Sequence, residues 1–492
     1  MKRVAVVGGG IGGLTAALLL QRKGAEVTLY ERGPRLGGRI GFEAEGPYRI
    51  DQGPTIVLLP EMLHGILEEA GVDRDRLPLL ACDPMYRIHF GSGRVLTKYA
   101  GRQEQAAEIE ALFSGEGAGF ERFMRDMDRL FLPGKAGLLE RSFPRQRDFW
   151  KPGLMSLMAK MRAYRSMRAQ IGRYFRNEEL IDAYSLQSLY IGGTPFATPG
   201  IYSLLPYAEH EYGVWMLKGG YFMLPRMLGE ELEQRGVDIR LNTEVKAIRI
   251  RNGKASGVET AGNGEETFDA VLYNGDFPSI SGLLQSEAGL VQARSRLFKP
   301  STGCLLIYLG VGRRWDQTLT HQFFLPENLH ASLKETFGRR KVPADPSFYV
   351  FNPAALDETA APPGESVLYF LVPVPSGSGI DWEQESPRLA AHVIRQAEQR
   401  GFPGLRSHIR WQKLRSPADA ERDGLYGGGS FGIAPLLSQS GVFRPQAKPY
   451  PAIEGLYAAG ASVHPGGGVP IVMQGAKMAA DQLIKEMRIG WM

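Results

Sequence analysis

Residues 2–39 read KRVAVVGGGIGGLTAALLLQRKGAEVTLYERGPRLGGR, and this stretch decides the fold. Residues 4–7 are a short apolar run, as in a buried parallel strand, and residues 14–22 carry the apolar stripe of a helix. Residues 25–30 form a second apolar run that ends at Glu31. The order strand, glycine-rich turn, helix and strand predicts a βαβ unit.

Gly8, Gly10 and Gly13 fit the dinucleotide pattern G-x-G-x-x-G in this unit. Gly8 permits the tight turn, Gly10 lets the backbone approach a pyrophosphate, and Gly13 lets the helix pack close to the strand. The pyrophosphate is expected at the helix N-terminus, where free N–H groups favour an anion. The alternative is a glycine-rich turn of any α/β domain, and the complete order of elements argues against it.

The residues after the second predicted strand point to the same ligand. Glu31 can accept hydrogen bonds from a ribose, and an acid there disfavours a 2′-phosphate, so NADP is not expected. Residues 36–39 read LGGR, and Gly53-Pro54 follow. A second glycine pair with Arg39 can bring backbone donors and a cation to the pyrophosphate of a permanently held dinucleotide. The alternative for Arg39 is a surface residue beside a turn.

Length and composition limit the class of protein. At 492 residues the chain is too long for one ordinary core, so two or three domains are expected. Cys82 and Cys304 lie far apart without a CxxC motif, and the eight histidines lack metal-ligand spacing. We therefore predict no disulfide framework and no metal site, which suits a reducing cytoplasm. No signal peptide or transmembrane helix is evident.

Residues 141–176 contain ten Arg or Lys residues against one acid, Asp148, with interleaved Met, Leu and aromatic residues. A basic helix with such a face is typical of a segment that lies in a membrane interface. A solvated basic helix that packs on the core by its Met face fits the pattern as well. Nucleic-acid binding is not expected, because no recognised binding module surrounds the segment.

Two later stretches resemble further parts of a nucleotide-binding domain. Residues 214–285 contain a predicted helix at 223–235 and predicted strands at 237–241, 247–251 and 270–274. Near the C-terminus a strand at 456–460 leads into SVHPGGGVP at 462–470 and a helix at 472–487. Glycines 466–468 let the backbone approach a flat ligand. The helix N-terminus behind them suits a flavin ring, whose reduced anion a positive dipole stabilises.

The predicted fold class is α/β, with a discontinuous Rossmann-like FAD-binding domain and an inserted substrate domain of mixed β-sheet and helices. We assign residues 1–80, 214–285 and 440–492 to the FAD-binding domain. Residues 81–213 and 286–439 would form the substrate and membrane-associated domain. Within it, the uncharged stretch 186–207 is expected to line an apolar tunnel or to be a core loop.

In the motifs near its N-terminus and its C-terminus, the chain resembles the bacterial phytoene desaturase family, within the flavin amine-oxidase-like fold. The motif GLYAAGASVHPGGGVPIVMQG at 455–475 matches that family almost entirely, with Val463 in place of the usual small or Thr residue. Matches to its thirty-carbon branch, dehydrosqualene (4,4′-diapophytoene) desaturase, are DQGPT at 51–55, YIG at 190–192, KGG at 218–220, DFPS at 276–279, SGSGIDW at 376–382 and FRPQ at 443–446. A sister branch oxidises terminal methyl groups. It tends to carry Asn at His464 and Met-Pro-Met at Val469-Pro470-Ile471, so desaturation is the preferred interpretation.

The resemblance implies FAD-dependent desaturation of an apolar, acyclic carotenoid precursor. It also implies peripheral contact with the inner face of the cell membrane, from which such a substrate must come. Oxidation of a terminal methyl group is the alternative within the family. A non-catalytic prenyl-lipid-binding protein on the same fold, like the GDP-dissociation inhibitors, is a further alternative, against which the intact fingerprint argues. The oligomeric state stays open.

The resemblance and the motifs together select the candidate site residues. The expected cofactor-binding residues are Gly8, Gly10, Ile11, Gly12, Gly13, Glu31, Arg32, Gly38, Arg39, Gly53, Pro54, Thr55, Val245, Gly460, Ala461, Gly468 and Val469. Val245 would contact the adenine through its backbone. Ala461 stands where many flavoproteins carry the Asp that binds the ribitol, so that contact stays unassigned.

The catalytic candidates are Arg147, Asp148 and His464. Arg147 and Asp148 are chosen by analogy with the family as polar residues near the reacting carbons, and an exposed ion pair is the alternative. His464 follows the last strand of the predicted FAD-binding domain, where it would tune the flavin or assist proton loss. A packed histidine bonded to the backbone is the alternative there.

Overall fold

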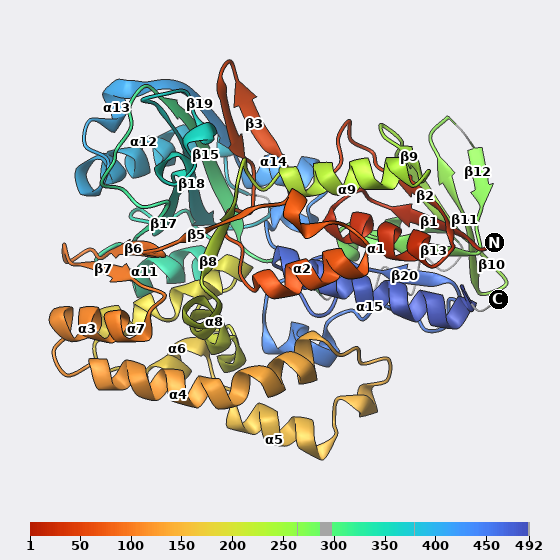
Figure 1. The fold of residues 1–492 in the computed structure, drawn as a ribbon, viewed down its shortest axis with the longest axis horizontal. Coiled ribbons are helices and arrows are strands. Elements are labelled where there is room, and N and C mark those ends of the chain that lie inside the picture. The colour runs from red at the N-terminus through yellow and green to blue at the C-terminus, as the bar shows by residue number, and fades with distance from the viewer. Residues whose placement is uncertain (263, 286–297, 378, 491–492) are drawn as a thin grey trace.

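The computed structural model describes residues 1–262, 264–285, 298–377 and 379–490. A five-stranded parallel sheet in the order β20-β13-β1-β2-β9 joins segments that lie far apart in the sequence (Figure 1). Its strands are β1 (Arg3–Val7), β2 (Glu26–Tyr30), β9 (Asp238–Arg240), β13 (Ala270–Tyr273) and β20 (Leu456–Ala458). The predicted α/β fold with a discontinuous nucleotide-binding sheet is confirmed.

Both faces of the parallel sheet are covered, as parallel strands require. Val4 and Val6 of β1 face a layer of helices, and Ala5 and Val7 face an antiparallel sheet. The helices are α1 (Ile11–Arg22), α2 (Pro60–Glu69), α9 (Met223–Gln234) and α15 (Val469–Met487). The antiparallel strands are β10 (Val245–Arg251), β11 (Lys254–Thr260) and β12 (Gly264–Thr267), and the short β14 (Leu284–Gln285) pairs in parallel with β10.

A seven-stranded mixed sheet dominates the other half of the molecule, in the order β19-β15-β18-β17-β16-β6-β7 (Figure 1). Its strands are β6 (Tyr86–His89), β7 (Val95–Lys98), β15 (Gly303–Val311), β16 (His321–Phe324), β17 (Phe348–Phe351), β18 (Ser366–Val374) and β19 (Ile409–Arg415). One face packs against α12 (Trp382–Arg400), and the other faces the interior of the molecule. Both insertions contribute strands to this one sheet, which supports our proposal that they form one substrate domain.

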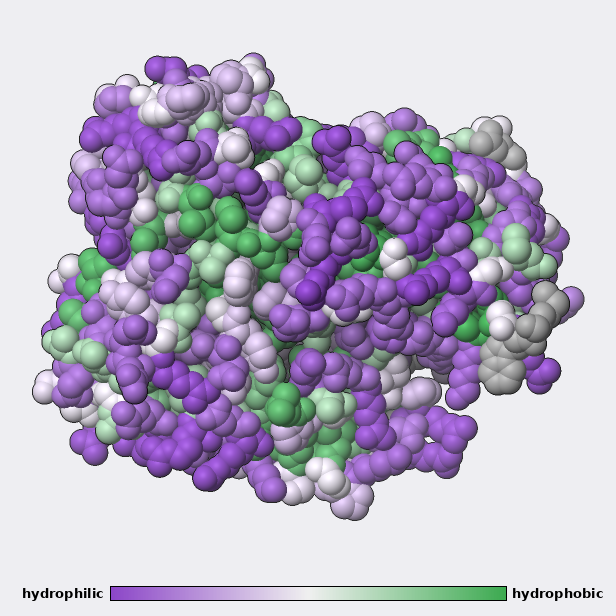
Figure 2. Space-filling view, in the orientation of Figure 1, coloured by the Kyte–Doolittle hydropathy of each residue, from purple (hydrophilic) through white to green (hydrophobic). Residues whose placement is uncertain are grey.

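Helices of the first insertion cover the interior face of that sheet. They are α3 (Arg102–Leu112), α4 (Gly117–Gly134), α6 (Met167–Ile171), α7 (Glu178–Ala183) and α8 (Leu204–Tyr212). Helix α5 (Pro152–Lys160) packs in a separate small cluster with Leu138, Phe143, Phe149 and Val442. Figure 2 shows a mostly hydrophilic surface on which hydrophobic side chains gather over α4 and α5. Among the residues that the structure describes, no helix is both long and apolar enough to cross a bilayer.

Smaller elements complete the fold. Strands β3 (Phe42–Glu45) and β4 (Tyr48–Asp51) form a hairpin, and β5 (Leu79–Cys82) pairs antiparallel with the distant β8 (Val214–Leu217). Three short helices are α11 (Leu329–Leu333), α13 (Leu405–His408) and α14 (Pro417–Arg422). Residues 286–297, where the second insertion was expected to begin, and Ser378 of the SGSGIDW motif lie outside the described residues.

The segment 141–176 is not one amphipathic helix, so this part of the sequence interpretation is wrong. It contains α5 and α6, joined by turns. Phe143 and Met167 are buried in the core, whereas Trp150 and Tyr164 are 54% and 65% exposed. The apolar residues that the pattern assigned to one face therefore divide between the core and the surface, because each short helix turns a different side inward.

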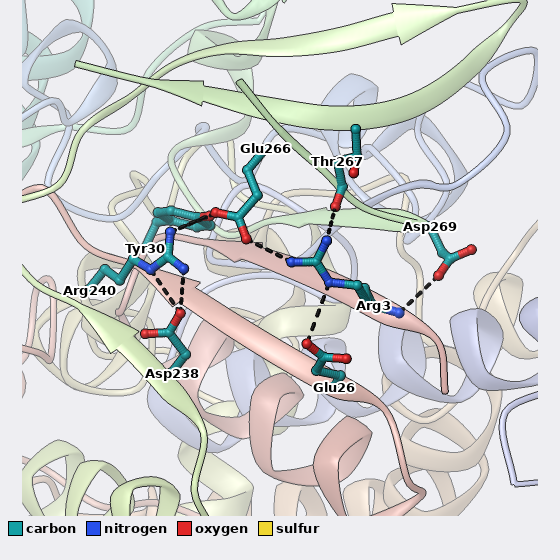
Figure 3. Close-up of polar contacts among 8 residues, drawn as sticks. All are labelled: Arg3, Glu26, Tyr30, Asp238, Arg240, Glu266, Thr267 and Asp269. Atoms are coloured by element: carbon teal, nitrogen blue, oxygen red, sulfur yellow. Dashed lines mark hydrogen bonds and ion pairs between the residues drawn. The ribbon is translucent and has the colours of Figure 1, made fainter. Parts of the chain in front are cut away.

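A cluster of charged residues joins the antiparallel sheet to the parallel one (Figure 3). Glu266 of β12 accepts hydrogen bonds from Arg3 at 2.7 Å, from Arg240 at 2.6 Å and from the Tyr30 hydroxyl at 2.9 Å. Arg3 also donates to the Thr267 carbonyl at 2.8 Å. These residues come from β1, β2, β9 and β12, so one carboxylate connects four strands. The side chains of Glu266, Arg3 and Arg240 are about one third exposed, so the cluster contributes modestly to stability.

Asp51, at the end of β4, connects the first segment of the FAD-binding half to the start of α9. Its carboxyl oxygens accept hydrogen bonds from the backbone N–H groups of Tyr221 at 2.8 Å and Phe222 at 3.1 Å, just before that helix begins. The side chain is buried, and burial raises the pKa of this carboxyl to about 7, although the two N–H groups oppose the shift.

We expect Asp51→Asn to change how stability depends on pH. The folded-state pKa of about 7 lies above the ordinary value of 3.8, so the folded chain keeps a proton that the unfolded chain has lost. The free energy of unfolding therefore falls as the pH rises between these values, and a neutral amide has no such dependence. The thermal unfolding midpoint of the variant should rise, relative to that of the unchanged protein, from about pH 5 to about pH 8. Midpoints that run parallel over this range would contradict the assignment.

Candidate active site

A cavity of about 1800 Å³ runs from the N-terminus of α1 into the substrate domain. Its lining includes Gly8 and Glu31 at one end and Tyr190 and Tyr349 at the other. Pockets for one small ligand usually measure roughly 300–1,000 Å³, so this cavity has room for a dinucleotide and a second long ligand.

At the dinucleotide end, the N-terminus of α1 presents free backbone donors. The N-cap residue is Gly10, no side chain caps the helix, and its first turn carries no acid. A Cβ on Gly13 would lie 2.1 Å from the Gly8 carbonyl oxygen, so only glycine lets the helix approach the strand this closely. The carboxylate of Glu31 accepts hydrogen bonds from the N–H groups of Gly9 at 2.8 Å and Gly33 at 2.7 Å, which holds it at the edge of the cavity.

Arg39 brings a cation to the same groove. Its Nη2 lies 3.0 Å from Oδ2 of Asp276, whose side chain is 1% exposed. Its Nε is buried and has no hydrogen-bond partner within the described part of the chain. Asp276 also binds the Ser462 hydroxyl and accepts a hydrogen bond from the Tyr426 N–H at 3.0 Å. The guanidinium is thus fixed with a donor still available for an anion.

A second helix N-terminus lines the cavity at α15. Its N-cap residue, Gly468, has φ +97° and no side chain caps the helix. The loop before it rests on Arg444, a buried guanidinium that donates to the backbone carbonyl groups of Ala461, Val463 and Gln439. Burial lowers the pKa of Arg444, but a guanidinium stays charged. This end of the cavity is therefore positive.

These features fit a flavin dinucleotide. The first glycine-rich turn and the orphaned Arg39 Nε suit a pyrophosphate, Glu31 suits a ribose, and the positive end at α15 suits a reduced flavin ring. Of the predicted cofactor-binding residues, all except Gly13 line the cavity. Gly13 has the packing role that the sequence assigned to it.

The catalytic candidates lie in three different settings. His464 lines the cavity but is 5% exposed, and its Nε2 donates to the Arg141 carbonyl at 2.9 Å. Burial lowers the pKa of His464 to about 4, so the ring is neutral and bonded to the backbone. Arg147 is exposed, and Asp148 pairs with Lys151 at 3.8 Å. Among the described residues that line the cavity, neither Arg147 nor Asp148 occurs, although Phe149 and Trp150 do.

The remainder of the cavity is an apolar tunnel. One wall is the interior face of the seven-stranded sheet, with Cys304, Leu306, Phe323, Leu325, Tyr349, Tyr369 and Leu371. The opposite wall comes from the uncharged residues 186–207. It includes Leu186, Leu189, Tyr190, Ile191, Ile201, Tyr202, Leu204 and Leu205. Of the two roles expected for residues 186–207, the geometry matches the lining of a tunnel.

Sequence reasoning missed Asp276 and Arg444 as site residues. Both stand in short motifs, DFPS and FRPQ, that the family resemblance singled out. Their contacts join residues that lie 237 positions apart for Asp276 with Arg39 and 17 apart for Arg444 with Ala461. No local pattern in one sequence reveals such pairs, so only their membership of a motif could have marked them.

Comparison with known proteins places this site in a family of flavoenzymes. Residues 11–484 match the family described as flavin containing amine oxidoreductase. The chain is 46% identical over 98% of its length to the 4,4′-diapolycopen-4-al dehydrogenase of Metabacillus indicus, and covers 97% of that protein. It is 33% identical to the zeta-carotene-forming phytoene desaturase of Myxococcus xanthus, over 98% of this chain and 94% of the other. It is 30% identical to the 4,4′-diapophytoene desaturase (4,4′-diaponeurosporene-forming) of Staphylococcus aureus strain Newman, over 99% of this chain and 100% of the other.

Solved structures of the same fold are more distant in sequence. An oxidoreductase from Methanosarcina mazei superposes with a TM-score of 0.67 at 17% identity, over 97% of this chain and 100% of the other. Cyclohexylamine oxidase from Brevibacterium oxydans IH-35A superposes with a TM-score of 0.64 at 14% identity, over 99% of both chains. These likenesses confirm the flavin amine-oxidase-like fold. The family match and the relatives in sequence identify the cofactor as FAD and the protein as an FAD-dependent oxidoreductase.

We expect Glu31→Gln to weaken FAD binding. The neutral amide loses the charge-assisted hydrogen bonds that a carboxylate makes to the Gly9 and Gly33 N–H groups and to a ribose hydroxyl. Such bonds correspond to roughly 10- to 100-fold in affinity. The measurement is the Kd of the apoprotein for FAD, by quenching of flavin fluorescence. Glu26→Gln, at the other end of β2, is the matched control and should bind FAD as the unchanged protein does. Equal affinity of all three proteins would show that Glu31 does not contact the cofactor.

Proposed function

The chain belongs to the flavin-containing amine oxidoreductase family, among its carotenoid desaturases and oxidases. From this premise we propose that it oxidises the end group of an acyclic thirty-carbon carotenoid, with an aldehyde as the group oxidised. The observation that carries the proposal is the 46% identity, over nearly both full lengths, to a 4,4′-diapolycopen-4-al dehydrogenase. Desaturases of the same family share 30–33%.

This proposal reverses the preference drawn from the sequence. Desaturation was preferred there because His464 and Val469-Pro470-Ile471 depart from the terminal-oxidase pattern. Only three of these positions differ, since Pro470 is common to both patterns, whereas the identity to the dehydrogenase extends over 486 residues. Full-length similarity is the broader observation, and it favours terminal oxidation, the alternative within the family.

The proposed reaction removes two electrons from the terminal carbon. Water adds to the aldehyde to give R–CH(OH)₂, and loss of one hydride and one proton gives R–COOH. When bound, FAD supplies the hydride acceptor. The positive end of the cavity at α15 and Arg444 favours the negative charge that this transfer creates.

The tunnel supplies orientation. An acyclic carotenoid is a long apolar rod, and the two tunnel walls from the seven-stranded sheet and residues 186–208 bury it. Because the tunnel is continuous with the dinucleotide groove, a rod that enters it with one end first can reach the cofactor. End-on binding presents a terminal carbon, rather than a bond in the middle of the chain.

We expect the FAD-loaded protein to oxidise 4,4′-diapolycopen-4-al without added pyridine nucleotide. Anaerobic mixing in liposomes should bleach the flavin absorption, and mass spectrometry of the extract should identify the carboxylic acid. Protein without FAD is the control and should leave the aldehyde unchanged. Absence of bleaching and of acid would contradict the proposal.

Desaturation is the second candidate, favoured by His464 and by Val469-Pro470-Ile471. The same anaerobic experiment with 4,4′-diapophytoene separates the two. Bleaching with this hydrocarbon and none with the aldehyde would assign the protein to the desaturases.

We further infer that the tunnel mouth docks on an anionic bilayer, such as the inner face of the cell membrane. Trp150, Tyr164, Leu437 and Phe443 line the cavity and are 54%, 65%, 46% and 46% exposed. The rings of Trp150 and Phe443 lie 6.3 Å apart and form one apolar patch. The segment that carries Trp150 and Tyr164 also carries exposed basic residues, namely Arg145, Arg147, Lys151, Lys160 and Arg165.

This combination suits a membrane interface. Aromatic side chains enter the headgroup region, and basic side chains bind anionic lipid. Phe149 and Val442, the chain neighbours of Trp150 and Phe443, pack with Leu154 of α5, so the patch lies beside this helix. A substrate dissolved in the bilayer could then enter the tunnel without crossing water.

We expect the double substitution Trp150→Ser and Phe443→Ser to reduce co-flotation with anionic liposomes, because it removes the apolar part of the patch. Leu356→Ser is the matched control, since Leu356 is 38% exposed but is not among the described residues that line the cavity. It should float like the unchanged protein. Equal flotation of all three proteins would exclude this surface as the docking site.

A further inference from the structure

A row of four hydrogen-bonding side chains extends from the tunnel wall into the core. The Thr55 hydroxyl lies 2.8 Å from the Tyr349 hydroxyl, which lies 2.6 Å from Nδ1 of His321. Nε2 of His321 lies 3.5 Å from the sulfur of Cys82. Thr55 and Tyr349 line the cavity, while His321 and Cys82 are buried behind them.

All four groups are neutral. Burial lowers the pKa of His321 to about 3 and raises the pKa of Cys82 to about 12. Burial also raises the pKa of the Tyr349 hydroxyl well above its ordinary value. A neutral row can lie beside an apolar ligand without the cost of a buried charge.

The row meets the tunnel where the dinucleotide groove ends. A Cβ on Gly53 would lie 2.5 Å from the Arg39 carbonyl oxygen, so residues 53–55 continue directly from the groove. The Tyr308 hydroxyl donates to the Gln52 carbonyl at 2.8 Å and ties the same segment to the seven-stranded sheet. Thr55 therefore stands between the cofactor part of the cavity and the apolar tunnel.

The ring of Tyr349 has apolar and aromatic neighbours. Tyr349 pairs with Phe323 on β16 and with Leu371 on β18, and its ring centroid lies 4.9 Å from that of Phe323. A hydrocarbon forms no hydrogen bonds with two hydroxyl groups at this position. A ligand that carries an oxygen at its end can form them.

The row can present either a donor or an acceptor to the tunnel. A hydroxyl both donates and accepts, and a neutral imidazole does one at each nitrogen. If Cys82 donates to His321 and each group donates to the next, the Thr55 O–H is free to donate to an aldehyde oxygen. If the direction reverses, Thr55 accepts from the O–H of an aldehyde hydrate. Both forms occur in the proposed oxidation.

We infer that the hydroxyl groups of Thr55 and Tyr349 form a binding site for the oxygen of an aldehyde or aldehyde-hydrate end group, with His321 as a positioning residue behind Tyr349. The inference rests on the proposed terminal oxidation and identifies how the substrate end is recognised. A site that hydrogen-bonds its ligand discriminates against the analogue without the oxygen.

The test uses anaerobic, FAD-loaded protein whose flavin has been reduced beforehand, so that the aldehyde binds without reacting. Resonance Raman spectra of bound 4,4′-diapolycopen-4-al should show a carbonyl stretch at lower frequency than in hydrocarbon solvent. Thr55→Val and Tyr349→Phe should move it back toward the solvent value. Each should also lower the preference for the aldehyde over the corresponding hydrocarbon by about 2- to 10-fold.

Tyr369→Phe is the matched control, because it removes a hydroxyl from the same wall but not from the row. It should keep the shifted band. His321→Asn retains a polar atom near the position of Nδ1 and should keep more of the shift than His321→Leu. Hydrocarbon binding and the flavin spectrum report whether each variant is folded.

An unshifted band in the unchanged protein overturns the inference, as does a shift that survives both Thr55→Val and Tyr349→Phe. If the unchanged protein shows the shifted band but does not oxidise the aldehyde, the proposed function fails and the binding site stands. If it oxidises the aldehyde with an unshifted band, the function stands and the binding site fails. If a variant does not fold, the band of the unchanged protein still decides.

Discussion

The buried carboxylate of Asp276 holds the cavity together. It contacts Arg39 from the first segment of the FAD-binding half, Ser462 from the last segment and the backbone of Tyr426. Removing one partner of a buried charge pair leaves the other uncompensated, which costs about 3–5 kcal/mol. The groove for the cofactor therefore exists only once these distant segments have folded onto one another.

The electrostatics of the cavity divide it into two parts. Two uncapped helix N-termini and two guanidinium groups, Arg39 and Arg444, make the dinucleotide part positive. The tunnel is neutral and mostly apolar, and even its polar row stays uncharged. Charge is thus kept to the cofactor end, where exclusion of water by the bound ligands strengthens every fixed dipole.

Desaturation and terminal oxidation differ less in chemistry than in substrate presentation. Both remove a hydride from carbon, and the proton leaves from a neighbouring carbon in desaturation and from a hydroxyl oxygen in oxidation of the hydrate. The same cofactor and the same positive end therefore serve either. The difference lies in which carbon reaches the cofactor and in whether an oxygen must be recognised there. That would explain why a few motif positions and the full-length identity favour different members of one family. A polar row at the junction of groove and tunnel is consistent with an oxygenated end.

Local patterns in the sequence determined the βαβ unit, the glycine-rich turn, Glu31 and the C-terminal strand and helix. Each depends on residues within one turn or one strand of each other, so a single sequence contains the whole signal. The limits of such reasoning are visible at 141–176, where the sequence shows the charge and hydrophobicity of the segment but not which side chains enter the core. Only the tertiary structure decided that Asp276 meets Arg39, that Thr55 meets Tyr349 and His321, and that Arg147 and Asp148 stay outside the cavity. These contacts span up to 294 positions along the chain, and chain folding rather than local propensity brings such residues together.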